Sequence, residues 1–201
     1  MSFARNAFIV FAITVVVAVL LTSLSSMNEQ DSGAYIDNFQ SNELTPEKIA
    51  DSFDFPVGPP DAKGYYNAQP FGENNHLGDD WNAITGGNSD YGDPIYAIAN
   101  GVVTDASDHG GGWGNVIRIV HKLPNNKEVE SLYAHCSEIT VEVGDQLVKG
   151  KQIGNIGDAN GAYTAHLHFE IRSVIGLPLG PGYASNKEGY LDPTEFINNN
   201  R

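Results

Sequence analysis

The residues best suited to chemistry in this sequence are its histidines, which are unevenly spread. His166 and His168 are one residue apart in "YTAHLHFEIR" (residues 163–172), a run with the character of a β-strand. Residues i and i+2 of a strand point to the same side, so both imidazoles share one face with Glu170. A solvated polar strand face accounts for this pattern unless other reactive side chains converge on the same place.

His76 and Asp80 form a second pair, four residues apart in "NNHLGDDWN". This spacing puts them on one side whether the segment is extended or helical, and Gly78 between them lets the backbone turn tightly. A neutral imidazole and a carboxylate are ordinary zinc ligands, although this pair alone is a weak signal. His135 adds a third imidazole in "SLYAHCSEI", where a regular strand would place it on the face of Tyr133.

Together these residues supply what a metal-dependent hydrolase requires. Three protein ligands leave a fourth zinc position open, where water is activated and a substrate carbonyl is polarised. Histidines that are not ligands can then transfer a proton and stabilise the developing oxyanion. Strand geometry does not decide which histidine of the H-x-H pair holds the metal. His109, in a glycine-rich loop, and His121, at a strand end, are expected to be structural.

Composition narrows the class of protein. Asp and Glu outnumber Lys and Arg by 25 to 11 in a chain of 201 residues, for a net charge of −14. This argues against nucleic acid as a partner, because no basic stripe is available to neutralise phosphates. The single cysteine, Cys136, excludes an internal disulfide and a cysteine-based zinc site. Strand alternation turns it away from His135, so we expect a small core residue rather than a nucleophile.

The first 64 residues differ in character from the rest. Residues 7–24, "AFIVFAITVVVAVLLTSL", are almost wholly apolar and follow Arg5. They predict a hydrophobic helix within residues 1–26, either a membrane anchor with a cytoplasmic N-terminus or a cleaved signal peptide. Both interpretations export the remainder of the chain. Residues 27–64 are predicted to form an acidic linker with one short helix that begins at Thr45 and Pro46.

Residues 65–201 predict an all-β domain, a mostly antiparallel folded sheet or sandwich. Short runs rich in β-branched residues alternate with glycine turns, and no long amphipathic helix interrupts them. The predicted strands are "PIYAIANGVVTDA", "NVIRIVH", "VESLYAHC", "ITVEV", "QLVKGKQIGNIG" and "HLHFEIR". Near the end, Asp192 to Glu195 predict the capped start of a closing turn of helix.

The order of these motifs resembles that of a known family. H-x-G-x-D is followed by "GDPIYAIANGVV", "GWGNVIRIVH", "LYAH", "VEVGDQLVKGKQIG" and "AHLHFEIR". Over residues 71–193 the chain resembles the LytM/lysostaphin-like zinc metallopeptidases, which cut peptide bonds in bacterial peptidoglycan. The resemblance implies one zinc ion (Zn2+) per chain. By the same resemblance the zinc ligands are His76, Asp80 and His168, and the catalytic pair is His135 and His166.

The sequence departs from the family pattern in a few places. Asn74 stands where arginine is frequent, Cys136 stands where leucine is usual, and the loop "GGNSDYG" is longer than a minimal version. These departures concern substrate preference more than activity. The resemblance implies an exported endopeptidase of the periplasm or cell envelope that acts on peptidoglycan peptides. The acidic surface, which teichoic acids would repel, favours a Gram-negative periplasm.

Two other functions compete with this interpretation. One is a non-catalytic relative that binds the cell wall or activates a partner amidase. The other is a carbohydrate-binding β-module with incidental histidines. All five functional positions of the family are filled here, which argues against both. Stoichiometric zinc in the purified protein would separate the peptidase from either alternative.

Overall fold

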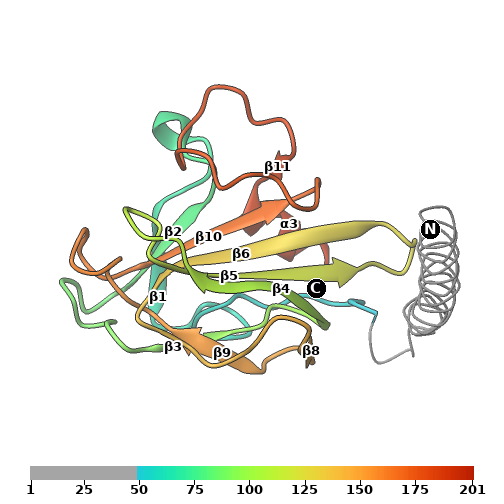
Figure 1. Ribbon diagram of the computed structural model, residues 1–201, viewed down its shortest axis with the longest axis horizontal. Coiled ribbons are helices and arrows are strands. Elements are labelled where there is room, and N and C mark those ends of the chain that lie inside the picture. The colour runs from blue at the N-terminus through green and yellow to red at the C-terminus, as the bar shows by residue number, and fades with distance from the viewer. Residues whose placement is uncertain (1–48) are drawn as a thin grey trace, which may run out of the picture. The chain divides into compact units, whose positions relative to one another are not determined.

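The computed structural model describes residues 49–201, which form two antiparallel β-sheets around a shared hydrophobic core (Figure 1). The large sheet has the strand order β1-β2-β10-β6-β5-β4-β8, and β11 pairs with β10. Its strands are β1 (Tyr65–Gln69), β2 (Asp79–Ala83), β4 (Gly101–Asp108), β5 (Asn115–Lys122), β6 (Glu128–Cys136), β8 (Gln146–Leu147), β10 (Leu167–Arg172) and β11 (Tyr190–Leu191). The small sheet has the order β3-β9-β7, formed by Pro94–Tyr96, Gln152–Asn155 and Glu138–Ile139. This confirms the all-β, mostly antiparallel fold that the sequence predicts.

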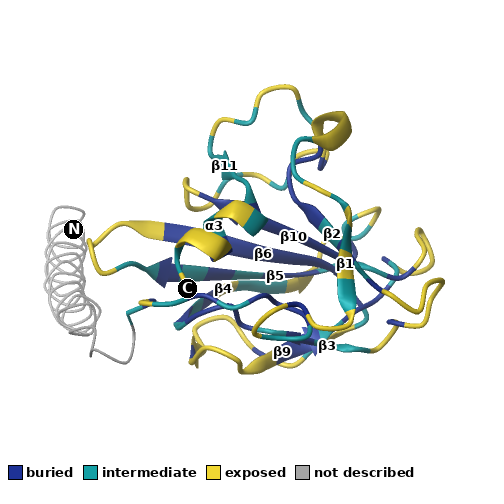
Figure 2. Cartoon of the chain, turned by 180° about the vertical axis from the view of Figure 1, so that it is seen from behind, coloured by how far each residue is buried: buried dark blue, intermediate teal, exposed yellow. Residues whose placement is uncertain are grey.

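The central strands bury both of their faces. In β10, Leu167, Phe169 and Ile171 belong to the main core, as strand alternation requires. The intervening His168 and Glu170 are buried too, on the opposite face of the large sheet. Figure 2 shows β10 and β6 largely in the colour of buried residues and β5 in a mixture of the buried and intermediate colours, while many of the surrounding loops are exposed. In β10 the side chains on the inner face are therefore apolar, and those on the outer face are polar but buried.

Part of the segment that the sequence assigns to the linker packs into this core. Phe53, Phe55 and Val57 are buried among the core side chains. The amide of Phe53 donates to the carbonyl of Asn200, and that of Asp54 donates to the carbonyl of Ile98. The folded unit therefore includes residues that precede the expected boundary at residue 65. These apolar side chains explain why, since an exposed linker would leave them in water.

The expected N-terminal helix (residues 7–24) and the short helix at Thr45 and Pro46 lie outside the described residues. Within residues 49–201 there is no helix with the length and apolar character needed to cross a bilayer. The described helices are the short 3-10 turn η3 (Glu73–Asn75) and α3 (Pro193–Asn199). The predicted start of α3 is confirmed, because the Asp192 side chain accepts a hydrogen bond from the amide of Glu195.

Three expected strands are shorter than the sequence indicates. The run from residue 146 to 157 forms only the short strands β8 and β9, which belong to different sheets. The run from residue 94 to 106 divides into β3 and β4, which belong to different sheets. The turn at residues 97–100 is buried at Ala97, Ile98 and Ala99, so apolar content there reflects core packing and not strand pairing. Similarly, only Ile139 of "ITVEV" is in a strand. Strands β1 and β2, which the sequence did not predict, carry one wall of the site.

Candidate active site

Strand pairing brings two of the expected metal ligands together. Asp80 on β2 lies directly opposite His168 on β10 in the antiparallel register. His76 lies three residues before β2, and Gly78 permits the close approach of this segment to β10. A Cβ atom at Gly78 would lie 2.5 Å from the carbonyl oxygen of Phe169 and 3.0 Å from Cε1 of His168. Glycine is therefore required here by the contact between strands, and its φ is not in the left-handed region.

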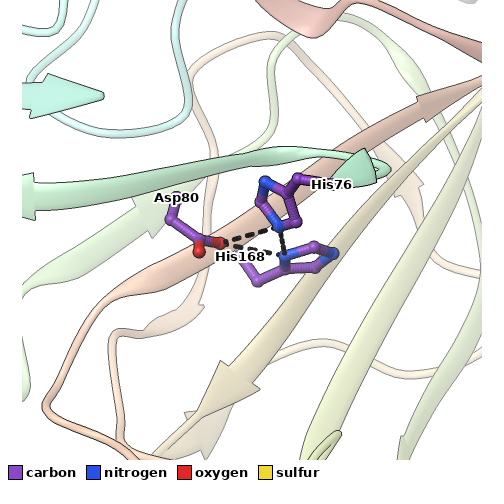
Figure 3. Close-up of side chains that lie close together, drawn as sticks. All are labelled: His76, Asp80 and His168. Atoms are coloured by element: carbon purple, nitrogen blue, oxygen red, sulfur yellow. Dashed lines mark hydrogen bonds and ion pairs between the residues drawn. The ribbon is translucent and has the colours of Figure 1, made fainter. Parts of the chain in front are cut away.

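The three expected ligands converge on one point (Figure 3). Nε2 of His76 lies 3.0 Å from Nδ1 of His168, which lies 2.9 Å from Oδ1 of Asp80. The remaining side of the triangle, from His76 Nε2 to Asp80 Oδ1, is 3.4 Å. Tetrahedral zinc with ligand distances near 2.0–2.1 Å separates neighbouring ligand atoms by about 3.3 Å. The donor set and its spacing fit zinc.

Hydrogen bonds on the far side of each imidazole fix which nitrogen faces this point. Nδ1 of His76 donates to the carbonyl oxygen of Gln69 at 3.1 Å, which leaves Nε2 for a metal. Nε2 of His168 donates to Oε1 of Glu170 at 2.9 Å, which leaves Nδ1. Metal-binding histidines usually have such a partner on the second nitrogen. The hydrogen bonds to Gln69 and Glu170 therefore orient both imidazoles for metal binding.

Electrostatics at this point favour a positive charge. Burial disfavours the charged form of His168, but hydrogen bonds to Asp80 and Glu170 outweigh it and raise its pKa to about 9. Burial likewise opposes ionisation of Asp80, yet the neighbouring histidines lower its pKa below the ordinary value. Without a metal, a proton is held between His168 and Asp80. A metal ion would replace that proton, so metal binding weakens as the pH falls.

The two remaining histidines of the expected site lie beside this cluster. The ring centroids of His135 and His166 are 4.8 Å apart, and His135 is 5.6 Å from His168. Nε2 of His166 is 3.8 Å from Oδ1 of Asp80. Nδ1 of His166 donates to the carbonyl of Thr164 at 2.8 Å, and Nδ1 of His135 donates to the carbonyl of Trp113 at 3.3 Å. Each ring thus keeps its Nε2 lone pair free.

His135 reaches the site through an irregular backbone. Its φ is +64°, in the left-handed region, and the pairing of β5 with β6 shifts register beside it. The expectation that His135 shares a strand face with Tyr133 is wrong, because Tyr133 is in the core while His135 lines the groove. Cys136 is buried in the core as expected, and burial raises the pKa of its thiol to about 12. The side chains of Cys136 and His135 point in different directions because of the irregular backbone and not because of strand alternation.

The charge state of His135 follows from its surroundings. Burial, reinforced by the neighbouring imidazoles of His168 and His166, lowers the pKa of His135 to about 3. The ring is therefore neutral at pH 7. A metal ion at the adjacent cluster would disfavour its protonation further, because like charges repel.

The cluster opens into a groove of about 420 Å³. The groove is lined by Gln69, Asp80, Gly112, Trp113, His135, Tyr163, His166, His168, Pro181, Gly182 and Tyr183. A shallower pocket shares Gln69, Asp80, Tyr163 and His166 with it and extends to Ala68, Asn82 and Thr164. The groove thus continues past the cluster, as an extended polymer would require. Its lining holds aromatic rings and one carboxylate, with no lysine or arginine.

Tyr183 belongs to a segment that the sequence did not connect with the site. The amide of Leu77 donates to the carbonyl of Gly182, and the amide of Ala184 donates to the carbonyl of Asn75. These bonds hold the loop of residues 173–189 against the segment that carries His76. The Tyr183 ring centroid lies 5.0 Å from that of His76, and its hydroxyl donates to Oε1 of Gln69 at 2.9 Å. No local sequence signal marks such a long-range contact.

The structure brings all five expected site residues together. Asp80, His135, His166 and His168 line the groove, whereas His76 is buried and reaches the cluster through its contact with His168. The histidines expected to be structural lie elsewhere. His109 pairs with Asp105 on an exposed hairpin, and His121 is wholly buried with both ring nitrogens hydrogen-bonded. Sequence reasoning missed the groove residues Trp113, Tyr163 and Tyr183.

Comparisons with known proteins agree with this arrangement. The family model described as "Peptidase family M23" matches residues 76–186. The lipoprotein NlpD of Yersinia enterocolitica is 38% identical over 81 residues, which cover 40% of this chain and 78% of the relative. Lysostaphin of Staphylococcus simulans is 32% identical over 111 residues, which cover 54% of this chain but only 21% of lysostaphin. The chain therefore corresponds to one part of that longer protein.

A solved structure supports the fold. The structure of the SpoIIQ-SpoIIIAH pore forming complex contains a chain that superposes with a TM-score of 0.54 at 20% identity. The superposition covers 74% of this chain and 92% of that one. The family model spans more than half of the sequence and contains all five clustered residues. The chain therefore belongs to peptidase family M23, the family of the LytM- and lysostaphin-like proteins.

Proposed function

We propose that this chain is a zinc-dependent endopeptidase that hydrolyses peptide bonds in bacterial peptidoglycan. The observation that supports this best is the triangle of donor atoms from His76, Asp80 and His168, with two further histidines beside it. In this proposal those three residues hold one zinc ion. Zinc would supply Lewis-acid polarisation of the scissile carbonyl.

The other residues of the groove have distinct tasks in this proposal. His135 and His166 both present a free Nε2 toward the groove, because backbone carbonyls hold their Nδ1 protons. A neutral imidazole in this position accepts a hydrogen bond or a proton from water that attacks the peptide carbonyl. Once protonated, it can donate to the tetrahedral oxygen or to the departing amine. The aromatic side chains of Trp113, Tyr163 and Tyr183 line the channel in which the peptide would lie.

The proposed location is the periplasm or cell envelope. Relatives of the chain include a protein named lipoprotein NlpD and a protein named cell division protein DipM. The apolar residues 7–24 would export the chain, either as a membrane anchor or as a signal peptide. Both routes give the groove access to peptidoglycan.

Digestion of purified peptidoglycan sacculi tests the proposal directly. The purified chain should contain one zinc per molecule and should release peptide fragments whose masses identify the bond that is cut. Chelation should stop the release, and added zinc should restore it. A His109→Ala variant is the matched control, because it removes an exposed histidine on a separate hairpin. Its activity should equal that of the unmodified chain.

The main alternative is a non-catalytic relative that binds the wall or activates an amidase. The NlpD relative is named as a lipoprotein and not as a peptidase, so this alternative is part of the test. Zinc at full occupancy with no fragment released, from sacculi that lysostaphin-like enzymes do cut, would favour the alternative. Absence of zinc binding would contradict both the metal site and the peptidase.

A further inference from the structure

The carboxylate that accepts the Nε2 proton of His168 is itself buried and belongs to a larger network of charged side chains. Glu170 has no exposed surface, and its Oε1 accepts the Nε2–H of His168 at 2.9 Å. Its other oxygen, Oε2, accepts from Nε of Arg172 at 2.6 Å. His168, Glu170 and Arg172 are alternate residues of β10, so all three point to the outer face of the large sheet.

The chain of charges continues across two neighbouring strands. Arg172 lies opposite Glu130 of β6 in the register, and its Nη1 is 3.7 Å from Oε1 of Glu130. Arg118 of β5 donates to the same oxygen from Nε at 2.9 Å and from Nη2 at 2.6 Å. The set of Glu170, Arg172, Glu130 and Arg118 contains two carboxylates and two guanidinium groups. Their formal charges cancel, which lowers the free-energy cost of burying the whole set.

The loop of residues 173–189 covers this network. The carbonyl oxygen of Leu177 accepts a hydrogen bond from Arg118 and another from Arg172, each at 2.9 Å. The amide of Gly176 donates to Oε2 of Glu130 at 3.2 Å. Arg172 and Glu130 are consequently buried, and the side chain of Arg118 is nearly so. Among the described residues, the side chains that hydrogen-bond to Glu170 are thus Arg172 at Oε2 and His168 at Oε1.

We propose that Glu170 is a positioning residue that sets the orientation and donor strength of the metal ligand His168. A carboxylate that accepts the Nε2 proton keeps that proton away from Nδ1 and fixes the plane of the ring. It also makes Nδ1 a stronger donor toward a cation, as such outer partners do for other metal-binding histidines. The hydrogen bond from Nε of Arg172 to Oε2 keeps Glu170 from rotating away. This inference rests on the zinc site of the proposed function.

A comparison of zinc affinities tests the role of Glu170. The full chain, a Glu170→Gln variant and a Glu130→Gln variant would compete with a chromogenic chelator for zinc. Glutamine keeps the size of the side chain but removes its charge. Glu170→Gln should bind zinc about 10- to 100-fold more weakly, the usual effect of losing such a partner. Glu130→Gln is the matched control, because it alters the same buried network without touching His168, and it should keep the original affinity.

A second measurement does not depend on how the variants fold. Nitrogen-15 NMR of the zinc-loaded, unmodified chain should show a slowly exchanging proton on Nε2 of His168 and the metal on Nδ1. The opposite assignment would overturn the inference, because the bond to Glu170 would then be absent. Circular dichroism of each variant reports whether a change in affinity reflects unfolding.

The outcomes separate this inference from the proposed function. If the unmodified chain binds zinc and the folded Glu170→Gln variant binds it equally tightly, Glu170 is only structural and the positioning role fails. Equal weakening in a folded Glu130→Gln variant would also overturn it, because the network as a whole would then set affinity. If the unmodified chain binds no zinc, the metal site fails, and this inference fails with it.

Discussion

At the level of single residues, His135 shows how the site departs from regular structure. A residue other than glycine with φ of +64° is uncommon, although histidine tolerates this conformation better than most. Here it turns the imidazole out of the core and into the groove, while Tyr133 and Cys136 stay inside. Backbone conformations of this kind gather at functional sites, where the surrounding structure holds them. The irregular backbone at His135 thus places a candidate catalytic imidazole in the groove.

Replacing His135 or His166 by alanine should reduce peptidoglycan hydrolysis without emptying the metal site. Neither ring is part of the donor triangle, so each variant should keep one zinc per chain. Loss of a general acid–base or oxyanion group should lower kcat by roughly 10²-fold or more. Zinc content and cleavage rate would be measured on the same preparations.

The zinc-ligand variant His168→Ala is the comparison for this pair. It should lose zinc and activity together, because it removes one of three ligands. Should His166→Ala lose its zinc while His168→Ala keeps it, the roles of the two histidines would be reversed. Retention of full activity in both His135→Ala and His166→Ala would contradict the proposed catalytic pair.

Four of the five site residues could be proposed from sequence because strand alternation and short spacings are local, whereas the strand face expected for His135 is wrong because its backbone is irregular. His166, His168 and Glu170 share a face by simple periodicity, and His76 and Asp80 are four residues apart. Which histidine of H-x-H faces the metal came only from family resemblance. The contact of Tyr183 with His76 spans more than a hundred residues of chain and leaves no local trace.

At the level of elements, the pairing of β2 with β10 determines the shape of the metal site. Asp80 opposes His168 only because β2 approaches β10 closely enough to form the ladder. The sequence predicted β10 but not β2 (Asp79–Ala83), which is only five residues long and has no β-branched side chain. Gly78 was expected to permit a tight turn. Instead, the structure shows that it permits close packing against Phe169 and His168.

A Gly78→Ala substitution should therefore disturb both stability and metal binding. The new methyl group would lie 2.5 Å from the carbonyl oxygen of Phe169 and 3.0 Å from the His168 ring, so β10 or the ligand must shift. Overpacking of this kind costs about 1–3 kcal/mol in the free energy of unfolding. Urea unfolding and chelator competition for zinc would measure the two effects.

Gly87→Ala provides the control for this substitution. It lies in an exposed loop, where a Cβ atom would contact nothing within 4 Å. Its φ of +62° gives some backbone strain but no contact with the metal site. Zinc affinity should therefore be unchanged in Gly87→Ala and reduced in Gly78→Ala. Equal zinc affinities would show that the two strands can separate slightly without moving His168.

At the level of the whole molecule, buried His121 links the β-sheet to the segment that precedes it. Its Nδ1 donates to the carbonyl of Asn100 at 2.9 Å, and the Ser131 hydroxyl lies 2.7 Å from its Nε2. The ring packs edge-on against Phe53, with centroids 5.7 Å apart. Burial lowers the pKa of His121 to about 4, whereas an ordinary histidine titrates near 6.5. The folded protein therefore holds this ring neutral under mildly acidic conditions.

This difference predicts a loss of stability in acid. Between pH 6.5 and about 4 the unfolded chain binds a proton at this position that the folded chain does not. The contribution is thus fully present above pH 6.5 and declines as the pH falls, by about 2 kcal/mol at pH 5. Urea unfolding at pH 7.5 and pH 5.0 would measure it in the metal-free chain. A His121→Gln variant should be less stable at pH 7.5 but should lose less on acidification, and equal losses would contradict the assignment.

The extent of the folded unit gives a prediction for truncated chains. Phe53, Phe55 and Val57 are buried in the main core, although they precede the boundary that the sequence suggests. Burying three such side chains stabilises the fold by roughly 5–9 kcal/mol, which is comparable to the total stability of a typical domain. A chain of residues 65–201 should therefore fail to unfold cooperatively, whereas residues 49–201 should show a single transition. Circular dichroism during thermal unfolding would distinguish them. Phe53→Ala in the longer chain should keep a single transition at a lower midpoint, because it removes one of the three buried side chains and its contact with His121. A cooperative transition of residues 65–201 at the midpoint of residues 49–201 would mean that these side chains fill space without stabilising the fold.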